Sequence, residues 1–219
     1  MTDPTRVLTL DRTTWVRNVN IAIKVALVTA FLVAIVFEPP GAQGKGMEFR
    51  APMFLGSAVL VPLIGITRKW NPLAHTADAL LAAPFLLDTV ANVGGFYERY
   101  NATDDVLHIT NWVLLVAAFH AFRFRNVHTR REAIFLGYGF GGLAIIWWEI
   151  FEWLVSTEGF GGPDGLALTY SDTVGDLLLS SSGGLIGSIA GVYLLGPTAV
   201  GRKDRGDVQV AAVGADGDG

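Results

Sequence analysis

The sequence predicts an all-α membrane protein, a bundle of six transmembrane helices with both termini in the cytoplasm. Of its 219 residues, 51% are apolar and only 16% are charged, a balance that soluble domains of this length rarely show. The apolar residues form continuous runs of about 20 residues, the length that crosses the hydrocarbon core of a bilayer. Basic residues gather in alternate connections between these runs, which indicates the orientation in the membrane.

The six apolar runs define the predicted spans. Because each run is continuous and does not alternate with period two, helices are expected and barrel strands are not. The spans cover residues 18–37, 51–67, 79–97, 106–122, 133–155 and 173–195. The predicted organisation is a cytoplasmic N-terminal segment (1–17), a six-helix transmembrane domain (18–196) and a Gly/Asp-rich cytoplasmic tail (197–219), which is expected to be disordered.

Basic residues distinguish the two sides of the predicted membrane. Only Lys45, Arg50 and Arg99 lie on one side. The other side carries twelve: Arg6, Arg12, Arg17, Arg68, Lys69, Arg123, Arg125, Arg130, Arg131, Arg202, Lys203 and Arg205. Under the positive-inside rule the richer side is cytoplasmic, so both termini are predicted there, as an even number of spans requires.

Composition also excludes several classes of function. The chain has no cysteine, which rules out disulfides and thiolate metal sites. Its formal net charge of −4 offers no basic face to a nucleic acid. The expected partners are therefore the lipid bilayer and a lipid or lipid-linked substrate, and the oligomeric state is left open.

Polar side chains collect in the outer half of the last four predicted spans, whereas the first two spans bring none. They come in pairs spaced three or four residues apart, and each pair therefore shares one face of its helix. The pairs are Asp88 and Asn92, Asp105 and His108, Glu149 and Glu152, and Asp172 and Asp176. Glycines at four-residue spacing in the last two spans predict that these helices pack closely, which would bring the carboxylates together.

Glu149 and Glu152 are the least expected of these residues, because they stand among tryptophans and aliphatic side chains in the run IIWWEIFEWLV. A carboxylate in such surroundings is protonated, paired with a cation or bound to a metal. Arg99 is the only arginine expected within reach, and His108 is the only titratable base. The acids are therefore expected to share protons or to bind a cation.

A metal site and a set of helix caps are the competing interpretations of the acids. Carboxylates with one imidazole suit a divalent Zn, Mg, Mn or Fe ion. The candidate ligands are His108, Glu149, Glu152, Asp172, Asp176, Asp88 and Asp105, supported by Asn92, Tyr97 and Arg99. For Asp104 and Asp172 the cap interpretation is favoured, and Thr173 with Asp176 resembles a capping box.

Four motifs of the chain resemble the YjdF-like family of bacterial inner-membrane proteins and, more distantly, the VanZ-like proteins. They are DTVANVGGFY from Asp88, DDVLH ending at His108, WEIFEW from Trp148 and YSDTVGDLLLSSSGG from Tyr170. The resemblance implies a compact bundle in the bacterial plasma membrane, whose polar positions match the pairs named above, but it implies no activity. Ser180 stands where the family pattern has an asparagine, so only a supporting polar role is expected there.

Three classes of function remain open at this point. The first is a metal-dependent hydrolase or transferase acting on a lipid or lipid-linked envelope substrate, with Glu149, Glu152 and His108 as catalytic residues. The second is a transporter or channel for protons or a divalent cation, in which the acids form the coordinating site. The third is a non-catalytic accessory membrane protein in which the polar cluster only holds the bundle together.

Overall fold

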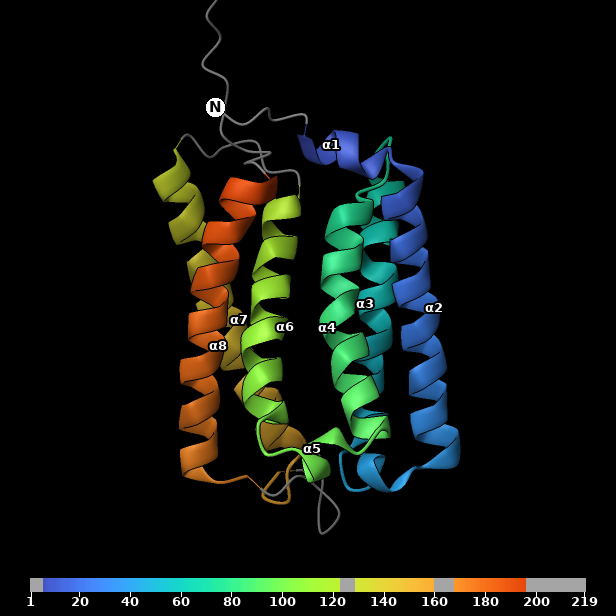
Figure 1. The fold of residues 1–219 in the computed structure, drawn as a ribbon, viewed down its shortest axis with the longest axis vertical. Helices are drawn as coiled ribbons and strands as arrows, with labels where there is room; N and C mark the ends of the chain where they lie inside the picture. The colour runs from blue at the N-terminus through green and yellow to red at the C-terminus, as the bar shows by residue number, and fades with distance from the viewer. Residues whose placement is uncertain (1–5, 123–128, 160–167, 196–219) are drawn as a thin grey trace, which may run out of the picture.

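The computed structural model is a bundle of long, upright helices and describes residues 6–122, 129–159 and 168–195 (Figure 1). None of these residues lies in a β-strand. The long helices are α2 (Thr14–Phe37), α3 (Met47–Thr67), α4 (His75–Val93), α6 (Thr103–Ala121), α7 (Arg130–Val155) and α8 (Tyr170–Ala190). The short elements are α1 (Arg6–Asp11), a 3-10 turn (Pro40–Ala42), α5 (Phe96–Arg99) and a π-helical turn (Gly191–Leu195) that continues α8.

Each long helix begins three or four residues before the start predicted from hydropathy. In α2, α7 and α8 a threonine caps a first turn that carries polar residues, so the apolar run begins only afterwards. α3, α4 and α6 begin without a side-chain cap. Thr13 accepts a hydrogen bond from the Val16 amide at the start of α2, and Thr129 forms a capping box with Glu132 at the start of α7. The third predicted span also ends early, at Val93, because two glycines interrupt it before α5.

Five of the described helices are long and apolar enough to cross a membrane, and α6 is not one of them. Asp104, Asp105, His108 and Asn111 lie in its first three turns and lower its hydropathy. The helix has 19 residues, about 28 Å at 1.5 Å per residue. It runs the same height as α4 and α8, between which it stands (Figure 1). The predicted count of six spans therefore depends on α6 alone.

The bundle consists of two groups of three helices, α2–α3–α4 and α6–α7–α8, joined where α4 packs against α6 (Figure 1). An aromatic core holds the first group together. The ring of Phe54 lies 5.8 Å from that of Phe31 and 5.0 Å from that of Phe85, measured between centroids. Trp148 of α7 packs against this core, so the second group closes onto the first at this level.

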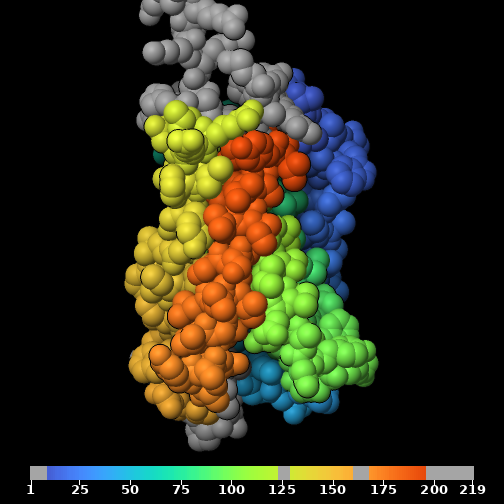
Figure 2. Space-filling model, turned by 60° about the vertical axis from the view of Figure 1, so that its left-hand side comes forward, coloured from blue at the N-terminus to red at the C-terminus, as the bar shows by residue number. Residues whose placement is uncertain are grey.

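Glycines set the distance between α6 and α8, and α8 lies between α6 and α7 on one face of the molecule (Figure 2). A Cβ atom added at Gly183 would lie 2.4 Å from the carbonyl oxygen of Ile109, and one added at Gly187 would lie 2.5 Å from that of Val113. Both obstacles are backbone atoms, which cannot rotate away. The predicted glycine spacing thus does allow close packing, but the partner of these two glycines of α8 is α6 and not α7, the neighbour expected from the sequence.

A separate polar cluster ties α1, α2 and α4 together at the end of the bundle where α2 begins. Asp78 is buried and accepts hydrogen bonds from Lys24 and from Asn20. Asp11 of α1 accepts from the backbone amide and the hydroxyl of Thr76 at the start of α4. Lys24 therefore forms an ion pair inside the bundle.

We expect Gly187→Ala to lower the free energy of unfolding by about 1 to 3 kcal/mol, because the new methyl group forces α8 away from the backbone of α6. Gly175→Ala is the matched control in the same helix, because no atom lies within 4 Å of its added Cβ. It should be neutral or slightly stabilising through its better helix propensity. Unfolding of the purified protein in detergent, followed by circular dichroism, measures both. Equal effects would contradict the packing described here.

Candidate functional site

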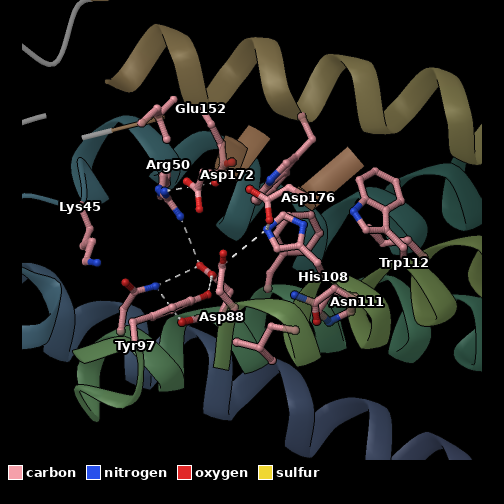
Figure 3. A pocket seen from close by; sticks show the side chains of 18 residues that line it. Lys45, Arg50, Asp88, Tyr97, His108, Asn111, Trp112, Glu152, Asp172 and Asp176 are labelled. Carbon is pink, nitrogen blue, oxygen red and sulfur yellow. Dashed lines mark hydrogen bonds and ion pairs between the residues drawn. The ribbon is translucent and has the colours of Figure 1, made fainter. Parts of the chain in front are cut away.

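A cavity of about 250 Å³ lies at the end of the bundle opposite the start of α2, where α3, α4, α6, α7 and α8 meet (Figure 3). Charged groups from all five helices and from the α2–α3 connection line it. They are Lys45, Arg50, Asp88, Asp104, His108, Glu152, Asp172 and Asp176. Most of the predicted polar residues therefore do meet in one place, together with two basic residues that the sequence had placed only in a loop.

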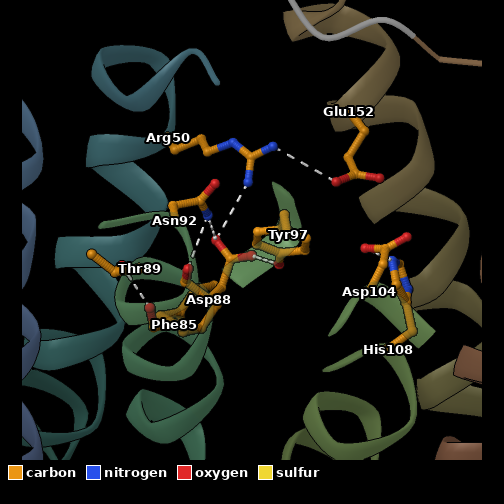
Figure 4. A network of polar contacts seen from close by, with 9 residues as sticks. All are labelled: Arg50, Phe85, Asp88, Thr89, Asn92, Tyr97, Asp104, His108 and Glu152. Carbon is orange, nitrogen blue, oxygen red and sulfur yellow. Dashed lines mark hydrogen bonds and ion pairs between the residues drawn. The ribbon is translucent and has the colours of Figure 1, made fainter. Parts of the chain in front are cut away.

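Arg50 is the cationic centre of the cavity. It lies in the first turn of α3, which the predicted span beginning at residue 51 missed by one position, and its exposure is only 4%. Its Nη1 atom donates to Oδ2 of Asp88 at 3.4 Å, and its Nη2 atom lies 3.7 Å from Oε1 of Glu152 (Figure 4). Arg50 thus connects α3 to both α4 and α7.

Asp88 accepts hydrogen bonds from three side chains, one of which is Arg50. Besides the arginine, it accepts hydrogen bonds from the Tyr97 hydroxyl at 2.6 Å and from the Asn92 side-chain amide at 3.2 Å. Burial and the neighbouring Asp88 carboxylate raise the pKa of the Tyr97 phenol far above its ordinary value, so this hydroxyl remains a donor. The predicted supporting roles of Asn92 and Tyr97 agree with these contacts, whereas Asp88 faces hydrogen-bond donors and not the other candidate ligands.

The arginine expected from the sequence, Arg99, is the wrong one. It is exposed at the end of α5 and does not line the cavity. The mistake follows from helix boundaries, because a span that starts at residue 51 leaves Arg50 in the loop, and a span that ends at residue 97 places Arg99 directly above the acids. The start of α3 has no side-chain cap that could have shown that Arg50 belongs to the helix.

His108 stands opposite Arg50 on α6. Its Nε2 atom lies 3.5 Å from Oδ1 of Asp104 and 3.3 Å from Oδ1 of Asp176. Its Nδ1 atom lies 2.9 Å from the hydroxyl of Ser180, which is fully buried. When Nδ1 donates this hydrogen bond, the lone pair of Nε2 faces the two carboxylates, so Ser180 orients the ring. The serine therefore has a supporting role through its neighbour.

Neither Asp104 nor Asp172 is a helix cap, so this interpretation is wrong. The residue that precedes α6 is Ala102, and the cap of α8 is Thr169, whose hydroxyl accepts from the Asp172 amide. Asp176 lies a turn further into α8 and contacts His108, not a capping partner. Both Asp104 and Asp172 line the cavity, whereas Asp105, the predicted ligand, is exposed and does not.

Glu149 lies one turn deeper in α7 than Glu152 and is not part of the cavity lining. Its Oε1 atom is buried and has no hydrogen-bond partner. Two sets of three residues place possible ligand atoms within 4.8 Å of one another, Asp104–His108–Asp176 and Glu149–Glu152–Asp176. Asp176 belongs to both sets and is therefore the residue that connects the carboxylates of α7 with the histidine of α6.

Negative charge exceeds positive charge in the cavity. Five carboxylates line it, those of Asp88, Asp104, Glu152, Asp172 and Asp176, against the two fixed cations of Lys45 and Arg50. Lys45 also forms an ion pair with Glu98 at 3.3 Å, so it compensates the five cavity carboxylates less completely. The carboxylates near His108 are consequently the ones short of counter-charge.

The cavity changes from polar to apolar with depth. Along one face of α6, Asp104 and His108 are followed by Asn111, Trp112 and Leu115. These positions span about 16 Å at 1.5 Å per residue. The same order holds on α4, from Asp88 to the deeper Phe85 and Pro84, and on α7, from Glu152 to Trp148. A ligand that fits this lining is polar at one end and apolar at the other.

The chain matches the family described as "Predicted membrane protein (DUF2238)" over residues 20–196. It belongs to this family of membrane proteins. The matched region contains every residue that lines the cavity. No curated protein and no solved structure matches the chain. The resemblance to YjdF-like and VanZ-like proteins stays a prediction.

Arg50→Gln should reduce the free energy of unfolding by about 3 to 5 kcal/mol, because it leaves the buried carboxylates of Asp88 and Glu152 without their cation. Adding Asp88→Asn should recover part of this loss, since one of the two unpaired charges is then removed. Unfolding of the detergent-purified variants measures both effects.

Lys45→Gln is the control for this experiment. It breaks a partly exposed ion pair with Glu98, which is expected to contribute at most about 1 kcal/mol. If Arg50→Gln were no more destabilising than Lys45→Gln, the central role given to Arg50 would be wrong.

Proposed function

We propose that this protein binds a divalent cation, Zn, Mg, Mn or Fe, in the cavity and acts as a metal-dependent hydrolase or transferase on a lipid or lipid-linked envelope substrate. The observation that carries the proposal is the shortage of counter-charge around His108, where the carboxylates of Asp104 and Asp176 lie within 3.5 Å of an oriented imidazole. The proposed setting is the bacterial plasma membrane, with α6 as the sixth span.

The distribution of basic residues supports an outward-facing cavity. Among the described residues, seven lie at the end of the bundle where α2 begins, against three at the cavity end. The seven are Arg6, Arg12, Arg17, Arg68, Lys69, Arg130 and Arg131, and the three are Lys45, Arg50 and Arg99. The basic residues 123, 125, 202, 203 and 205 and the predicted disordered tail lie outside the described residues. The positive-inside rule then puts both termini in the cytoplasm and the cavity at the outer face.

Asp104, His108 and Asp176 are the proposed first ligands of the cation. Two carboxylates and one imidazole, with further positions open, resemble the three-ligand arrangement of catalytic metal sites more than a closed structural site. Ser180 supplies the hydrogen bond that keeps the other ring nitrogen available. Glu152, which shares the Asp176 side of the cavity, is the proposed general base, and Glu149 supports it from one turn deeper.

The amphipathic lining supports a lipid or lipid-linked substrate with its reacting group near the cation. A cation held by Asp104, His108 and Asp176 would lower the pKa of a bound water. Glu152 would take up a proton of the water whose oxygen bonds to the electrophilic atom of the substrate. The bond to the leaving group breaks with its electron pair on the leaving atom, which takes up a proton. In a transferase the hydroxyl of an acceptor takes the place of water.

The cysteine-free chain allows a direct test of the orientation and of α6 as a span. Asn101 lies exposed just before α6, and Arg131 lies exposed in the first turn of the following helix. We expect a membrane-impermeant maleimide to label Asn101→Cys in intact cells and not Arg131→Cys, because α6 separates them across the membrane. Permeabilised cells should label both. Labelling of both in intact cells would show that α6 does not cross.

Metal binding is tested by elemental analysis of the full chain, purified in detergent after growth with added Mn²⁺ or Zn²⁺. We expect about one ion per chain in the wild type. The metal content should fall at least tenfold in Asp176→Asn and in His108→Ala, since each substitution removes a proposed ligand. Asp105→Asn is the matched control, because it removes an exposed carboxylate at the same end of α6.

The reaction is followed by incubating the purified protein with extracted membrane lipids and measuring released headgroups by mass spectrometry. Chelation of the metal and Glu152→Gln should each abolish turnover, whereas Asp105→Asn should retain it. Wild-type protein that carries no metal under any of these conditions would rule out the proposal.

A further inference from the structure

Arg50 has hydrogen-bonding capacity that its protein partners do not use. A guanidinium carries five N–H donors. Asp88 accepts one at 3.4 Å, and Glu152 lies at 3.7 Å from Nη2, beyond hydrogen-bond distance. The Nε atom is buried and has no hydrogen-bond partner among the described residues. The whole residue is only 4% exposed and forms part of the cavity wall (Figure 3). A buried donor without an acceptor is costly, so these unused donors point to a ligand that supplies oxygen atoms.

The position of the guanidinium is set before any ligand arrives. Asp88 holds it, and Asp88 is itself held by Tyr97 and Asn92. Lys45 is a second cation that lines the same cavity, and it lies 5.3 Å from the centre of the Tyr97 ring. Two cations in one cavity, one of them fixed in orientation, form a recognition site for an oxyanion.

A short series of contacts connects Arg50 to the proposed cation site. Arg50 lies 3.7 Å from Glu152, whose carboxylate lies within 4.8 Å of that of Asp176, which in turn is 3.3 Å from His108. Arg50 and the proposed cation ligands therefore line one cavity, with Glu152 between them. A planar carboxylate offers only two oxygens, whereas the phosphate of a monoester offers three that are not esterified.

We propose that the substrate of this site is a phosphate monoester of an apolar alcohol, whose phosphate accepts hydrogen bonds from the guanidinium of Arg50 in the cavity that Asp104, His108 and Asp176 also line. This assignment rests on the proposed function, because a phosphate dianion cannot enter a cavity that has five carboxylates unless a cation is already bound. Its hydrolysis forms a bond from a water oxygen to phosphorus and breaks the phosphorus–oxygen ester bond. The alcohol oxygen keeps the electron pair and takes up a proton, which leaves the free alcohol and inorganic phosphate.

The size of the cavity agrees with a headgroup and the beginning of a chain. At about 250 Å³ it lies just below the range of about 300 to 1,000 Å³ typical of small-molecule pockets. The phosphate would occupy the polar region near Arg50, and the first carbon atoms would lie against Trp112, Leu115 and Trp148 in the deeper apolar region. Free inorganic phosphate, which lacks these carbons, should bind more weakly than an alkyl ester.

The test uses the full chain in detergent, loaded with Mn²⁺, and hexyl phosphate as the water-soluble probe, with binding measured by calorimetry. We expect hexyl phosphate to bind the Mn²⁺-loaded wild type more tightly than inorganic phosphate, hexanoate or hexyltrimethylammonium. Arg50→Gln should weaken hexyl phosphate binding by roughly tenfold to a hundredfold while the Mn²⁺ content stays unchanged. Lys45→Gln should weaken it less, and Asp105→Asn should leave it unchanged.

The outcomes separate this inference from the proposed function. A wild type that takes up no Mn²⁺ refutes the proposed function, and it also refutes this inference, which rests on that function. Three results would overturn this inference alone. The Mn²⁺-loaded wild type could fail to bind hexyl phosphate or could prefer hexyltrimethylammonium. Alternatively, the Arg50→Gln variant could bind hexyl phosphate as tightly as the wild type does. Should Arg50→Gln not fold, the phosphorus resonance of hexyl phosphate decides the question in the wild type. Strong broadening by bound Mn²⁺ supports a phosphate beside the cation, and its absence refutes it.

Discussion

The ion pair between Arg50 and Asp88 is the interaction on which the cavity depends. An unpaired guanidinium inside a membrane bundle would cost several kcal/mol, so its position requires anions from neighbouring helices. Asp88 supplies the first and Glu152 the second, and Tyr97 and Asn92 complete the hydrogen bonding of Asp88. One buried cation thereby joins α3, α4, α5 and α7 around a single space.

The same interaction divides four of the five described carboxylates of the cavity into two groups. Those of Asp88 and Glu152 lie next to the Arg50 guanidinium, whereas those of Asp104 and Asp176 lie next to the imidazole of His108. The first group stabilises the bundle and holds Arg50. The second group lacks counter-charge, and this shortage is the physical basis of the proposed cation site. Glu152 belongs to both halves of the cluster, because it lies beside Arg50 and is also the proposed general base.

Much of the polar cluster could be predicted from spacing, because residues three or four apart share a face of their own helix. His108 and Asp176, on different helices, do meet, and Glu152 does face the same cavity. Spacing could not choose between Asp104 and Asp105, which are adjacent in α6. That choice depends on how far α6 is rotated about its axis, which no local pattern in the sequence specifies.

The sequence by itself determined the membrane class, the helical composition and the end of the bundle where the acids gather, because hydropathy and charge act along the chain. Only the tertiary structure decided which cation meets which carboxylate. Arg50 and Asp88 are 38 residues apart, and His108 and Ser180 are 72 apart. No local pattern connects such residues, since their contact depends on where the helices start and on helix distances set by glycine.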